Sequence, residues 1–468
     1  MQQTEIAVVG AGSAGIAAAL AARRAGAQVT LVDEYAQAGG QIYRRPSSEF
    51  QVLSEEALGR DYVRARQLAR ELTGASASLL ANTLVWGVDG ADTLLLYREG
   101  GRADALRASA IVVAAGAYDR PIAFPGWTLP GVWTAGGAQA MLKGQRILAG
   151  RRVLVAGAGP LLLPVASALV AAGAAVVGIV EATTRRAWVR QAYRMVGHWG
   201  RIGDAIRYEA ALRIARVPRF FGHTVLRAEG RGRVERVTIA AVDRAWRPRA
   251  GTERTLDVDL LCVGYGFLSA VELPALLGCE MVYLPAQEQF VPRHTAEMAS
   301  SIPHVFVAGE TTGVGGAHLA WAEGTIAGVM AARLIGHGGG AEDARALRAA
   351  QRRRHHELRF ARLLDDLFAM QPGIYDLGRP DTPLCRCEEV TRAEVEDAVR
   401  RGAASVRAVK GMTRVGQGPC QGRMCAHLVA HVVAHETGRP LSEVLDVTPR
   451  PPIKPIPLDA LAQCRRAV

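Results

Sequence analysis

Residues 5–34 read EIAVVGAGSAGIAAALAARRAGAQVTLVDE and contain the pattern that decides the fold. A β-branched strand, an alanine-rich helix and a second strand follow one another, and the turn between the first strand and the helix is G-x-G-x-x-G, formed by Gly10, Gly12 and Gly15. The first glycine allows a tight turn, the second lets a pyrophosphate approach the backbone, and the third lets helix and strand pack closely. The stretch therefore predicts a Rossmann-like βαβ unit whose helix N-terminus, at Ser13 and Ala14, binds a dinucleotide.

The second strand of this unit ends in two acidic residues. Asp33, with Glu34 beside it, is placed to bind a ribose through its hydroxyls. The stretch AQAGGQIY follows directly, with Gly40 and Gln41 in a tight turn. A dinucleotide with two ribose groups is the ligand that this combination favours.

Two later segments repeat a hydrophobic strand that ends in small residues. ASAIVVAAGAYDR ends its strand at Ala115 and Gly116, and SIPHVFVAGETTGVGGAHLAWAEG leads into a glycine-initiated helix. This order of signals resembles the two-dinucleotide-binding-domain flavoproteins. The resemblance implies that FAD is bound by the first βαβ unit, the GGQ turn and the late segment, where Glu310 replaces the usual aspartate. The residues that the resemblance adds to the site are Gly40, Gln41, Ala115, Gly116, Gly309, Glu310, Gly316 and Ala317.

A second βαβ unit lies in the middle of the chain. The stretch from Val153 to Val180 has no charge and is long enough to span a bilayer, but its glycines and prolines divide it into strand, turn, helix and strand. Leu162 stands where the third glycine of G-x-G-x-x-G is expected, which would restrict a bound pyrophosphate. We interpret the unit as either degenerate or reused for a non-redox adenine nucleotide, and NAD(P)H as hydride donor is the alternative.

The C-terminal part contains the strongest metal-ligand pattern. PLCRCEEV and GPCQGRMC supply a C-x-C and a C-x4-C pair, namely Cys385, Cys387, Cys420 and Cys425. Four thiolates complete the ligand set of a [2Fe–2S] cluster or a structural zinc site. Two observations favour [2Fe–2S]. Zinc sites usually use C-x2-4-C pairs, and C-x-C does not fit that spacing. The second pair lies in a glycine-rich loop whose N–H groups can donate to cluster sulfurs. The segment resembles the bacterioferritin-associated-ferredoxin-like [2Fe–2S] domain, which implies the same four ligands.

Catalytic residues cannot be assigned from the pattern. The only cysteines before residue 385 are Cys262 and Cys279, and they are too far apart to form a redox dithiol, which excludes dithiol-disulfide reductases. Cys262 lies in the apolar strand VDLLCVGYG and is expected to be a core thiol. No plausible general base is recognised beside the expected flavin.

Composition and net charge exclude several other classes of protein. Hydrophobic residues make up 49% and charged residues 21% of the 468 residues, which is typical of soluble globular proteins and excludes disorder. The net charge is +12, but no basic-aromatic stripe is present, so we expect no nucleic-acid binding. The N-terminus MQQTEIAVVG lacks a signal-peptide pattern, so we expect a cytoplasmic protein, and peripheral attachment to the inner face of the membrane stays open.

These signals predict an α/β fold of the two-dinucleotide-binding-domain type, with duplicated Rossmann-like units and a small helical C-terminal domain. The expected divisions are an FAD-binding domain at 1–150 and 270–340, a second, degenerate nucleotide-binding domain at 151–269, a helical linker at 341–376, a [2Fe–2S]-binding domain at 377–440, and a proline-rich tail at 441–468. The tail reads as an extended strap suited to lying across another surface.

Nearly the whole chain resembles one family, the electron-handling subunits of heteromeric amino-acid dehydrogenases. Its members are the A-type subunit of opine oxidase, the B-type subunit of hydrogen cyanide synthase, and the α-subunits of D-hydroxyproline and dye-linked L-proline dehydrogenases. RPIAFPGWTLPGVWTAGGAQAMLKGQ at 120–145 and RPPIKPIPLDALA at 450–462 contribute to the likeness.

The resemblance implies a relay subunit that takes electrons from an FAD-containing, amino-acid-oxidase-like β-subunit. The relay subunit would deliver them to an acceptor such as a quinone or cytochrome. An FMN at a subunit interface and a small third subunit remain open. The alternative is a stand-alone NAD(P)H-dependent FAD and iron–sulfur oxidoreductase.

Overall fold

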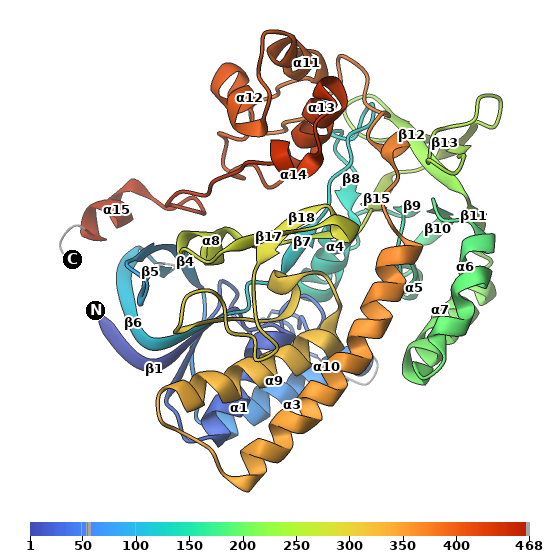
Figure 1. Ribbon diagram of the computed structural model, residues 1–468. Coiled ribbons are helices and arrows are strands. Elements are labelled where there is room, and N and C mark those ends of the chain that lie inside the picture. The colour runs from blue at the N-terminus through green and yellow to red at the C-terminus, as the bar shows by residue number, and fades with distance from the viewer. Residues whose placement is uncertain (48, 53, 55–57, 99, 465–468) are drawn as a thin grey trace. The chain divides into compact units, whose positions relative to one another are not determined.

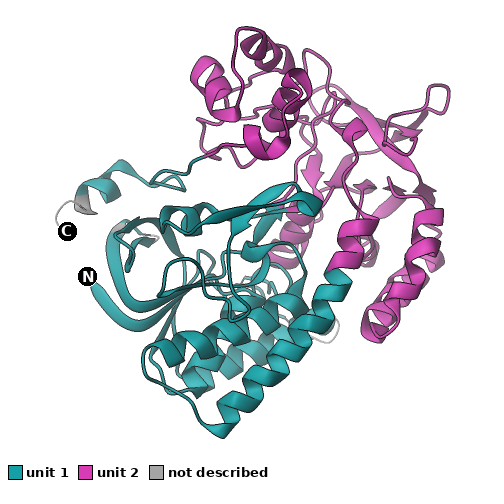
Figure 2. Cartoon of the chain, viewed as in Figure 1, with its two compact units in different colours: residues 1–118, 268–361, 448–468 teal, residues 119–267, 362–447 magenta. Residues whose placement is uncertain are grey.

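The computed structural model describes residues 1–464, apart from 48, 53, 55–57 and 99. The chain divides into two units, shown in Figure 2. Unit 1 consists of residues 1–118, 268–361 and 448–468, and unit 2 of residues 119–267 and 362–447. The chain passes from unit 1 to unit 2 after Tyr118, and residues 448–468 belong to the same unit as the N-terminus.

Unit 1 is built on a seven-stranded sheet in the order β3-β2-β1-β6-β5-β4, with β19 paired to β6 (Figure 1). The strands β1, β2, β3, β6 and β19 are parallel to one another, whereas β4, β5 and β6 form an antiparallel meander. The strands are β1 (Gln2–Val9), β2 (Val29–Val32), β3 (Ser78–Leu80), β4 (Thr83–Asp89), β5 (Thr93–Arg98), β6 (Arg102–Val113) and β19 (Val305–Val307), with a separate hairpin of β17 (Met281–Leu284) and β18 (Gln289–Pro292).

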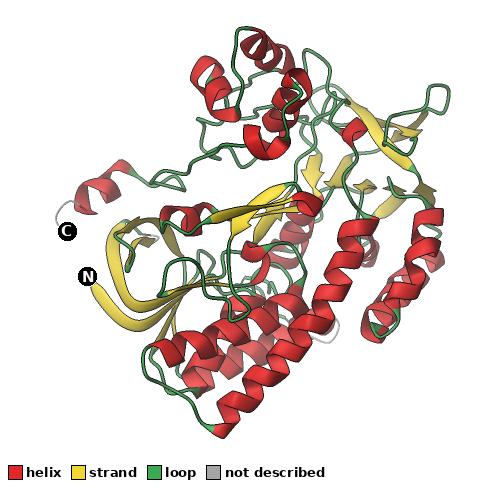
Figure 3. Ribbon diagram, viewed as in Figure 1, coloured by secondary structure: helices red, strands yellow, loops and turns green. Residues whose placement is uncertain are grey.

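Helices cover this sheet, as Figure 3 shows. They are α1 (Ser13–Arg24), α3 (Arg60–Gly74), α8 (Glu272–Leu276), α9 (Ala317–Leu334), α10 (Ala341–Leu367) and α15 (Leu458–Cys464). The helices α1 and α9 approach closely because α9 presents glycines to α1. A Cβ on Gly324 would lie 2.0 Å from the carbonyl oxygen of Ala14, and one on Gly328 would lie 2.2 Å from that of Ala18.

Unit 2 contains a five-stranded parallel sheet in the order β11-β10-β9-β15-β8 and an antiparallel sheet in the order β12-β13-β14. The parallel strands are β8 (Val132–Thr134), β9 (Arg152–Gly157), β10 (Ala175–Glu181), β11 (Arg219–Phe221) and β15 (Leu260–Gly264), and the antiparallel ones are β12 (His223–Glu229), β13 (Arg236–Ala241) and β14 (Arg254–Asp257). The uncharged middle stretch is thus the buried βαβ unit that its glycines and prolines predict, and no described helix is long and apolar enough to cross a membrane.

The helices of unit 2 fall into two groups. Those of the nucleotide-binding part are α4 (Ala135–Ala140), α5 (Leu162–Ala171), α6 (Arg185–Gln191) and α7 (Trp199–Ile214), and those of the C-terminal part are α11 (Arg392–Arg400), α12 (Val406–Thr413), α13 (Ala426–Thr437) and α14 (Leu441–Val444). Thr391 caps α11 in a capping box with Glu394. The short strands β7 (Ala117–Asp119) and β16 (Phe267–Ser269) lie where the chain passes between the units.

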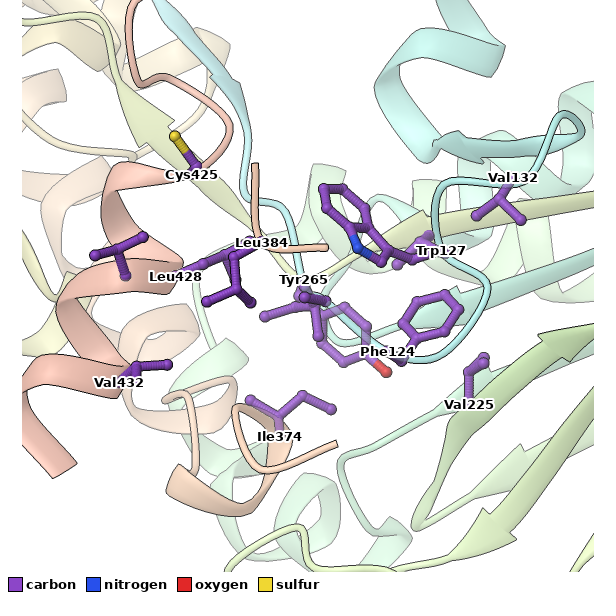
Figure 4. Packing of buried hydrophobic residues seen from close by; sticks show 14 of the residues in the cluster. Phe124, Trp127, Val132, Val225, Tyr265, Ile374, Leu384, Cys425, Leu428 and Val432 are labelled. Carbon is purple, nitrogen blue, oxygen red and sulfur yellow. The ribbon is translucent and has the colours of Figure 1, made fainter. Parts of the chain in front are cut away.

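One hydrophobic core joins both parts of unit 2. Figure 4 shows Leu428 of α13 and Leu384 near the aromatic side chains of Phe124, Trp127 and Tyr265. The Trp127 indole N–H also donates to the Pro383 carbonyl at 2.7 Å. The C-terminal helices are therefore part of unit 2 and not a separate body.

The proline-rich tail packs on strand β4 of unit 1. Ile453 is buried in the core of that unit, and its backbone N–H donates to the Trp86 carbonyl at 2.9 Å. The Lys454 ammonium pairs with the Glu34 carboxylate. The expected strap thus lies on the unit that also contains the first glycine loop.

Candidate functional site

The first glycine loop forces the chain to run close to its neighbours. Gly10 has a φ of +100°, and a Cβ there would lie 2.2 Å from the Ala114 carbonyl oxygen. A Cβ on Gly15 would lie 1.7 Å from the carbonyl oxygen of Gly10. Only glycine fits either position, which is the physical reason for the spacing of the motif.

The space above the N-terminus of α1 is open. Nothing lies nearer than 3.8 Å to a Cβ built on Gly12, and that neighbour is the Cα of Gly40. Gly12 is the N-cap of α1, and no side chain caps the first amides of the helix. Exposed amides at a helix N-terminus suit a phosphate group, because both the N–H donors and the helix dipole favour negative charge.

The GGQ turn closes over this loop. The Gly39 N–H donates to the Ala11 carbonyl at 2.8 Å, and Gly40 has a φ of +59°. A Cβ on Gly40 would lie 2.7 Å from the Cα of Gly12, so the turn and the loop are in backbone contact. Gln41, the third residue of the turn, is exposed.

The two acidic residues after β2 have different roles. Asp33 is buried, and its carboxylate accepts hydrogen bonds from the N–H groups of Ala11 at 2.5 Å and Tyr35 at 2.8 Å. Burial raises the pKa of Asp33 in spite of these hydrogen bonds. Glu34 is exposed and pairs with Lys454. Asp33 is therefore the acid that fixes the glycine loop to the strand.

Three parallel strands end side by side at this loop. The register pairs Val9 of β1 with Val113 of β6, and Val113 with Val307 of β19. The segments that follow these strands thus leave the sheet at one edge, where ligands of open α/β sheets bind. They bring together the predicted residues Gly10, Gly12, Ser13, Ala14, Gly15, Ala115, Gly116, Gly309, Glu310, Gly316 and Ala317.

The late segment is held by a polar network. The Glu310 carboxylate accepts from the N–H of Gly316, the N-cap of α9, and burial raises the pKa of Glu310. The Glu310 carbonyl accepts from the Ser269 hydroxyl at 2.6 Å. The Gly116 N–H donates to the Thr311 hydroxyl at 3.1 Å, which ties this segment to the end of β6.

Sequence reasoning missed the residue at the centre of this network, Glu323 of α9. Its side chain is buried, and it accepts from the Gly309 N–H at 3.1 Å, from the Thr312 hydroxyl at 3.0 Å, and from the Arg354 guanidinium of α10 at 3.0 Å. A signal was available, because Glu323 is the single acidic residue in the otherwise apolar helix AHLAWAEGTIAGVMAARL. Its partner Arg354 lies in a run of arginines and carries no such signal.

The second glycine loop, in unit 2, keeps two of the three glycines. A Cβ on Gly157 would lie 1.8 Å from the Gly264 carbonyl oxygen, whereas a Cβ on Gly159 would meet nothing within 4 Å. The Glu181 carboxylate accepts from the N–H groups of Gly159 at 3.4 Å and Thr183 at 3.0 Å. Burial raises the pKa of Glu181 to about 7. Leu162 is buried at the start of α5.

The four C-terminal cysteines meet in unit 2 and form what we call the cysteine cluster. Cys385 and Cys387 precede α11, Cys420 lies in the loop after α12, and Cys425 caps α13. The Cys425 thiol is in hydrogen-bond contact with the sulfurs of Cys385 and Cys420, and the sulfur of Cys387 contacts that of Cys420. Two pairs of cysteines that are separated by 32 intervening residues thus form one group of sulfurs.

Backbone N–H groups of the glycine-rich loop point at these sulfurs. The Cys385 sulfur accepts from the Gly416 N–H and the Cys420 sulfur from the N–H groups of Met424 and Gly422. The Cys425 thiol, followed by these amides, lowers the pKa of both Cys385 and Cys420 to about 5. The contacts therefore favour negative charge on Cys385 and Cys420, whereas the same contacts raise the pKa of the Cys425 thiol.

The other cysteines behave as core residues where the structure describes them. Cys262 is fully buried in β15, and burial raises the pKa of its thiol to about 12. Cys279 is also buried, and its pKa is raised by burial. Cys262 is thus the core thiol that the sequence predicts.

Comparisons with known proteins agree with the fold and with the class of reaction. Residues 4–324 match the family model of pyridine nucleotide-disulphide oxidoreductases, and residues 384–465, which include the cysteine cluster, match the sarcosine oxidase A3 domain. The predicted α/β flavoprotein fold and the predicted oxidoreductase class are confirmed, and the family supports FAD as the cofactor.

Relatives of similar length are subunits of larger enzymes. The chain is 33% identical to hydrogen cyanide synthase subunit HcnB of Pseudomonas aeruginosa, over 97% of both chains. It is also 33% identical to one of the opine oxidase subunits of Rhizobium meliloti, again over 97% of both. The fold is similar to that of L-proline dehydrogenase from P. horikoshii, with a TM-score of 0.70 over 98% of this chain and 79% of that one, at 19% identity. Because the relatives are subunits, other subunits are implied for this chain as well.

Proposed function

Because the chain belongs to the pyridine nucleotide-disulphide oxidoreductase family and is related over its whole length to hydrogen cyanide synthase and opine oxidase subunits, we propose that it is the FAD- and [2Fe–2S]-binding subunit of a heteromeric dehydrogenase. The proposed substrates are amino acids or opines of the proline, hydroxyproline, opine or glycine type. One observation supports the relay role above all: an open dinucleotide loop and a group of four thiols occur in the same chain.

The residues of unit 1 fit FAD. The uncapped N-terminus of α1 would bind the pyrophosphate, and Asp33, which fixes the loop, is nearest to the expected ribose. Bound FAD supplies two-electron chemistry at its ring and can release electrons singly. Glu310 would hold the N-terminus of α9 toward the ring through its hydrogen bond with Gly316. No residue of this chain is assigned as a general base.

The residues of the cysteine cluster fit a [2Fe–2S] centre. Four sulfurs complete its ligand set, and the amides of Gly416 and Gly422 would donate to them, which is a known influence on reduction potential. A Cβ on Gly418 would lie 2.3 Å from the Cβ of Cys387, so glycine is required for the close approach of the loop. A [2Fe–2S] centre carries one electron at a time. A structural zinc ion is the alternative occupant.

Two measurements on the purified chain test the cofactors. Acid extraction should release about one FAD per chain, and elemental analysis should find iron with little zinc. Cys420→Ser should remove the iron and its charge-transfer absorption but leave the flavin band, whereas the matched control Cys262→Ser should keep both. Zinc in place of iron, or flavin loss in Cys420→Ser, would count against the assignment.

The substrate would be oxidised on a different chain. We propose an FAD-containing β-subunit of the amino-acid-oxidase type, which removes two electrons and two protons from the C–N bond of the substrate and passes the electrons to this chain. A quinone or cytochrome would be the final acceptor, and an FMN between subunits and a small third subunit are further components of the proposal. Native mass spectrometry of the complex, with dye-reduction assays for each substrate type, tests this division. Full activity of the lone chain with a simple amino acid would contradict it.

A second candidate function, a stand-alone NAD(P)H-dependent oxidoreductase, is favoured by the second glycine loop. Gly157, Gly159 and Glu181 are arranged there much like the first loop. Leu162 argues against it, because a buried leucine at the position of the third glycine keeps the helix away from the strand, where close packing is needed to bind a pyrophosphate. We therefore propose that this loop is degenerate or binds a non-redox adenine nucleotide. Rapid bleaching of the flavin by NADH or NADPH in stopped flow, at the rate of turnover, would favour the reductase instead.

A further inference from the structure

We propose that α6 and α7, with the turn between them, form a docking face for an anionic phospholipid surface. This segment, residues 185–216, is called the basic hairpin below. It connects β10 to β11 in unit 2. Neither glycine loop nor the cysteine cluster includes any of its residues, so the inference does not depend on the proposed function.

The basic hairpin exposes large apolar side chains that a folded protein normally buries. Six of them are between 60% and 84% exposed: Val189, Tyr193, Val196, Trp199, Ile206 and Ile214. Scattered exposed apolar residues need no explanation, but a concentration of this kind in one short segment marks an interaction surface. The six residues come from α6, the turn, and the start, middle and end of α7.

The apolar stripe of α7 faces solvent. Trp199, Gly203, Ile206, Ala210 and Ile214 follow the i, i+4, i+7, i+11, i+15 spacing of one helix face, and all five are exposed. Leu212 is the one buried residue of this helix. In a surface helix the stripe with this period normally points to the core. The outward direction here means that the stripe has a partner outside the fold.

The basic hairpin has a strongly positive net charge. It contains eight arginines and two acidic residues, so its net charge is +6, half of the +12 of the whole chain. The arginines are at positions 185, 186, 190, 194, 201, 207, 213 and 216. Both acids are already held in ion pairs, Asp204 with Arg207 at 3.0 Å and Glu209 with Arg219 at 2.5 Å. Arg194 pairs with Asp366 of α10 at 2.6 Å. The partner must therefore be anionic as well as apolar.

An anionic bilayer meets both requirements at once. Isoleucine and valine side chains enter the boundary of the acyl region, tryptophan and tyrosine prefer the level of the headgroups, and arginine binds phosphate. A second copy of this chain is disfavoured, because two faces of the same positive charge repel. An acidic protein surface is the remaining competitor, and the experiment below distinguishes it.

The test is flotation of the full, flavin-loaded chain with vesicles of phosphatidylcholine, with and without phosphatidylglycerol. We expect binding to the anionic vesicles alone, weakened by added salt. Trp199→Ser/Ile206→Ser/Ile214→Ser should reduce the partition coefficient by more than about ten-fold, because each apolar side chain loses its burial in the membrane. Arg190→Gln/Arg213→Gln should reduce it by about five-fold per arginine.

Matched controls separate this effect from a general loss of apolar or basic surface. Leu458→Ser removes an apolar side chain of α15 that is 83% exposed, as Ile214 is 84% exposed, and Arg400→Gln/Arg401→Gln removes two exposed arginines of α11. Both controls should float like the wild type, and all variants should keep their flavin and their circular dichroism. The proposal is wrong if the wild-type chain binds neither vesicle or both equally, or if the hairpin variants float unchanged. Loss of co-purification with another subunit in the hairpin variants, without an effect on flotation, would assign the face to a contact with an acidic protein and overturn the proposal.

Discussion

The two glycine loops of this chain both read G-A-G, and they differ in where the following helix begins. In the first loop α1 begins at Ser13, directly after Gly12, and the third glycine, Gly15, lets the helix touch the loop backbone. In the second loop α5 begins only at Leu162, the position of the missing glycine. The acid at the end of the strand is present in both units and binds its loop in both.

The comparison separates two parts of a dinucleotide motif. The strand-end carboxylate, Asp33 or Glu181, organises the loop through backbone hydrogen bonds whether or not the third glycine is there. The third glycine decides how near the helix amides come to a ligand. A motif search that weights the first two glycines and the acid would treat the loops as equal, whereas the packing around Gly15 and Leu162 distinguishes them.

The largest expected effect on flavin content comes from Gly15→Ala in the first loop, and Gly159→Ala in the second loop is its matched control. In Gly15→Ala the new Cβ would lie 1.7 Å from the Gly10 carbonyl oxygen, so the helix must move, and we expect loss of nearly all flavin and more than about 3 kcal/mol of stability. Gly159→Ala meets open space and has only the strain of a φ of +126°, about 1–2 kcal/mol, so its flavin content should be unchanged. Flavin absorbance per chain and thermal unfolding measure both. Equal flavin loss in the two variants would contradict the claim that only the first loop binds the flavin.

The next effect tests the hydrogen bonds of Glu323, which hold the segment after β19 beside the first glycine loop. Glu323→Gln leaves the Arg354 guanidinium without its carboxylate in a largely buried position and weakens the contacts to Gly309 and Thr312, which should cost about 3–5 kcal/mol and lower FAD affinity. Arg353→Gln on the same helix removes an exposed partner of Glu357 at 3.7 Å and should cost no more than about 1 kcal/mol. Flavin titration of the apoprotein is the measurement. Wild-type affinity in Glu323→Gln would show that the network does not support the site.

A third change asks whether Leu162 is structural. The side chain is buried, so Leu162→Ala should cost about 2–4 kcal/mol of unfolding free energy. It should not make NADH reduce the flavin, because α5 would still begin two residues later than α1 does relative to its loop. Chemical denaturation and stopped-flow absorbance are the measurements. Rapid reduction by NADH in this variant would mean that the leucine alone closes the second site.

The smallest effect concerns the buried acid of the second loop. Burial raises the pKa of Glu181 from 4.5 to about 7, so the folded chain holds this proton more tightly than the unfolded chain. Stability is therefore lost as the pH rises from 4.5 to 7, by about 3 kcal/mol at most, and the loss is complete above pH 7. Glu181→Gln cannot ionise, so its unfolding midpoint relative to wild type should rise between pH 5 and pH 8. If the difference in unfolding midpoint between Glu181→Gln and wild type is constant across this range, the pKa of Glu181 is not raised by folding.

Sequence reasoning succeeds where the signal is local. The turn at Gly10, the acid Asp33 and the core position of Cys262 each follow from a short stretch whose geometry is set by its own residues. The fold class follows from the same stretches in series, because a repeated βαβ unit admits few arrangements.

Sequence reasoning fails where the partners are far apart along the chain. The Glu323–Arg354 pair joins two helices, and nothing in the arginine run around Arg354 indicates which residue turns inward. Glu34 and Lys454 lie near opposite ends of the chain, and nothing in the tail sequence indicates their ion pair or the contact of the tail with β4. The outward stripe of α7 has the period of an ordinary surface helix, and the period alone does not give its direction.

The return of the tail to unit 1 has a consequence for synthesis on the ribosome. The core of that unit includes Ile453, which leaves the exit tunnel long after the strands β1 and β2 of the same core. Unit 2 has a similar dependence, because its core joins Phe124 to Leu428. The N-terminal dinucleotide unit must therefore wait for the synthesis of these later residues with its apolar faces incomplete. Chaperones or early cofactor capture have the greatest influence on yield during this time.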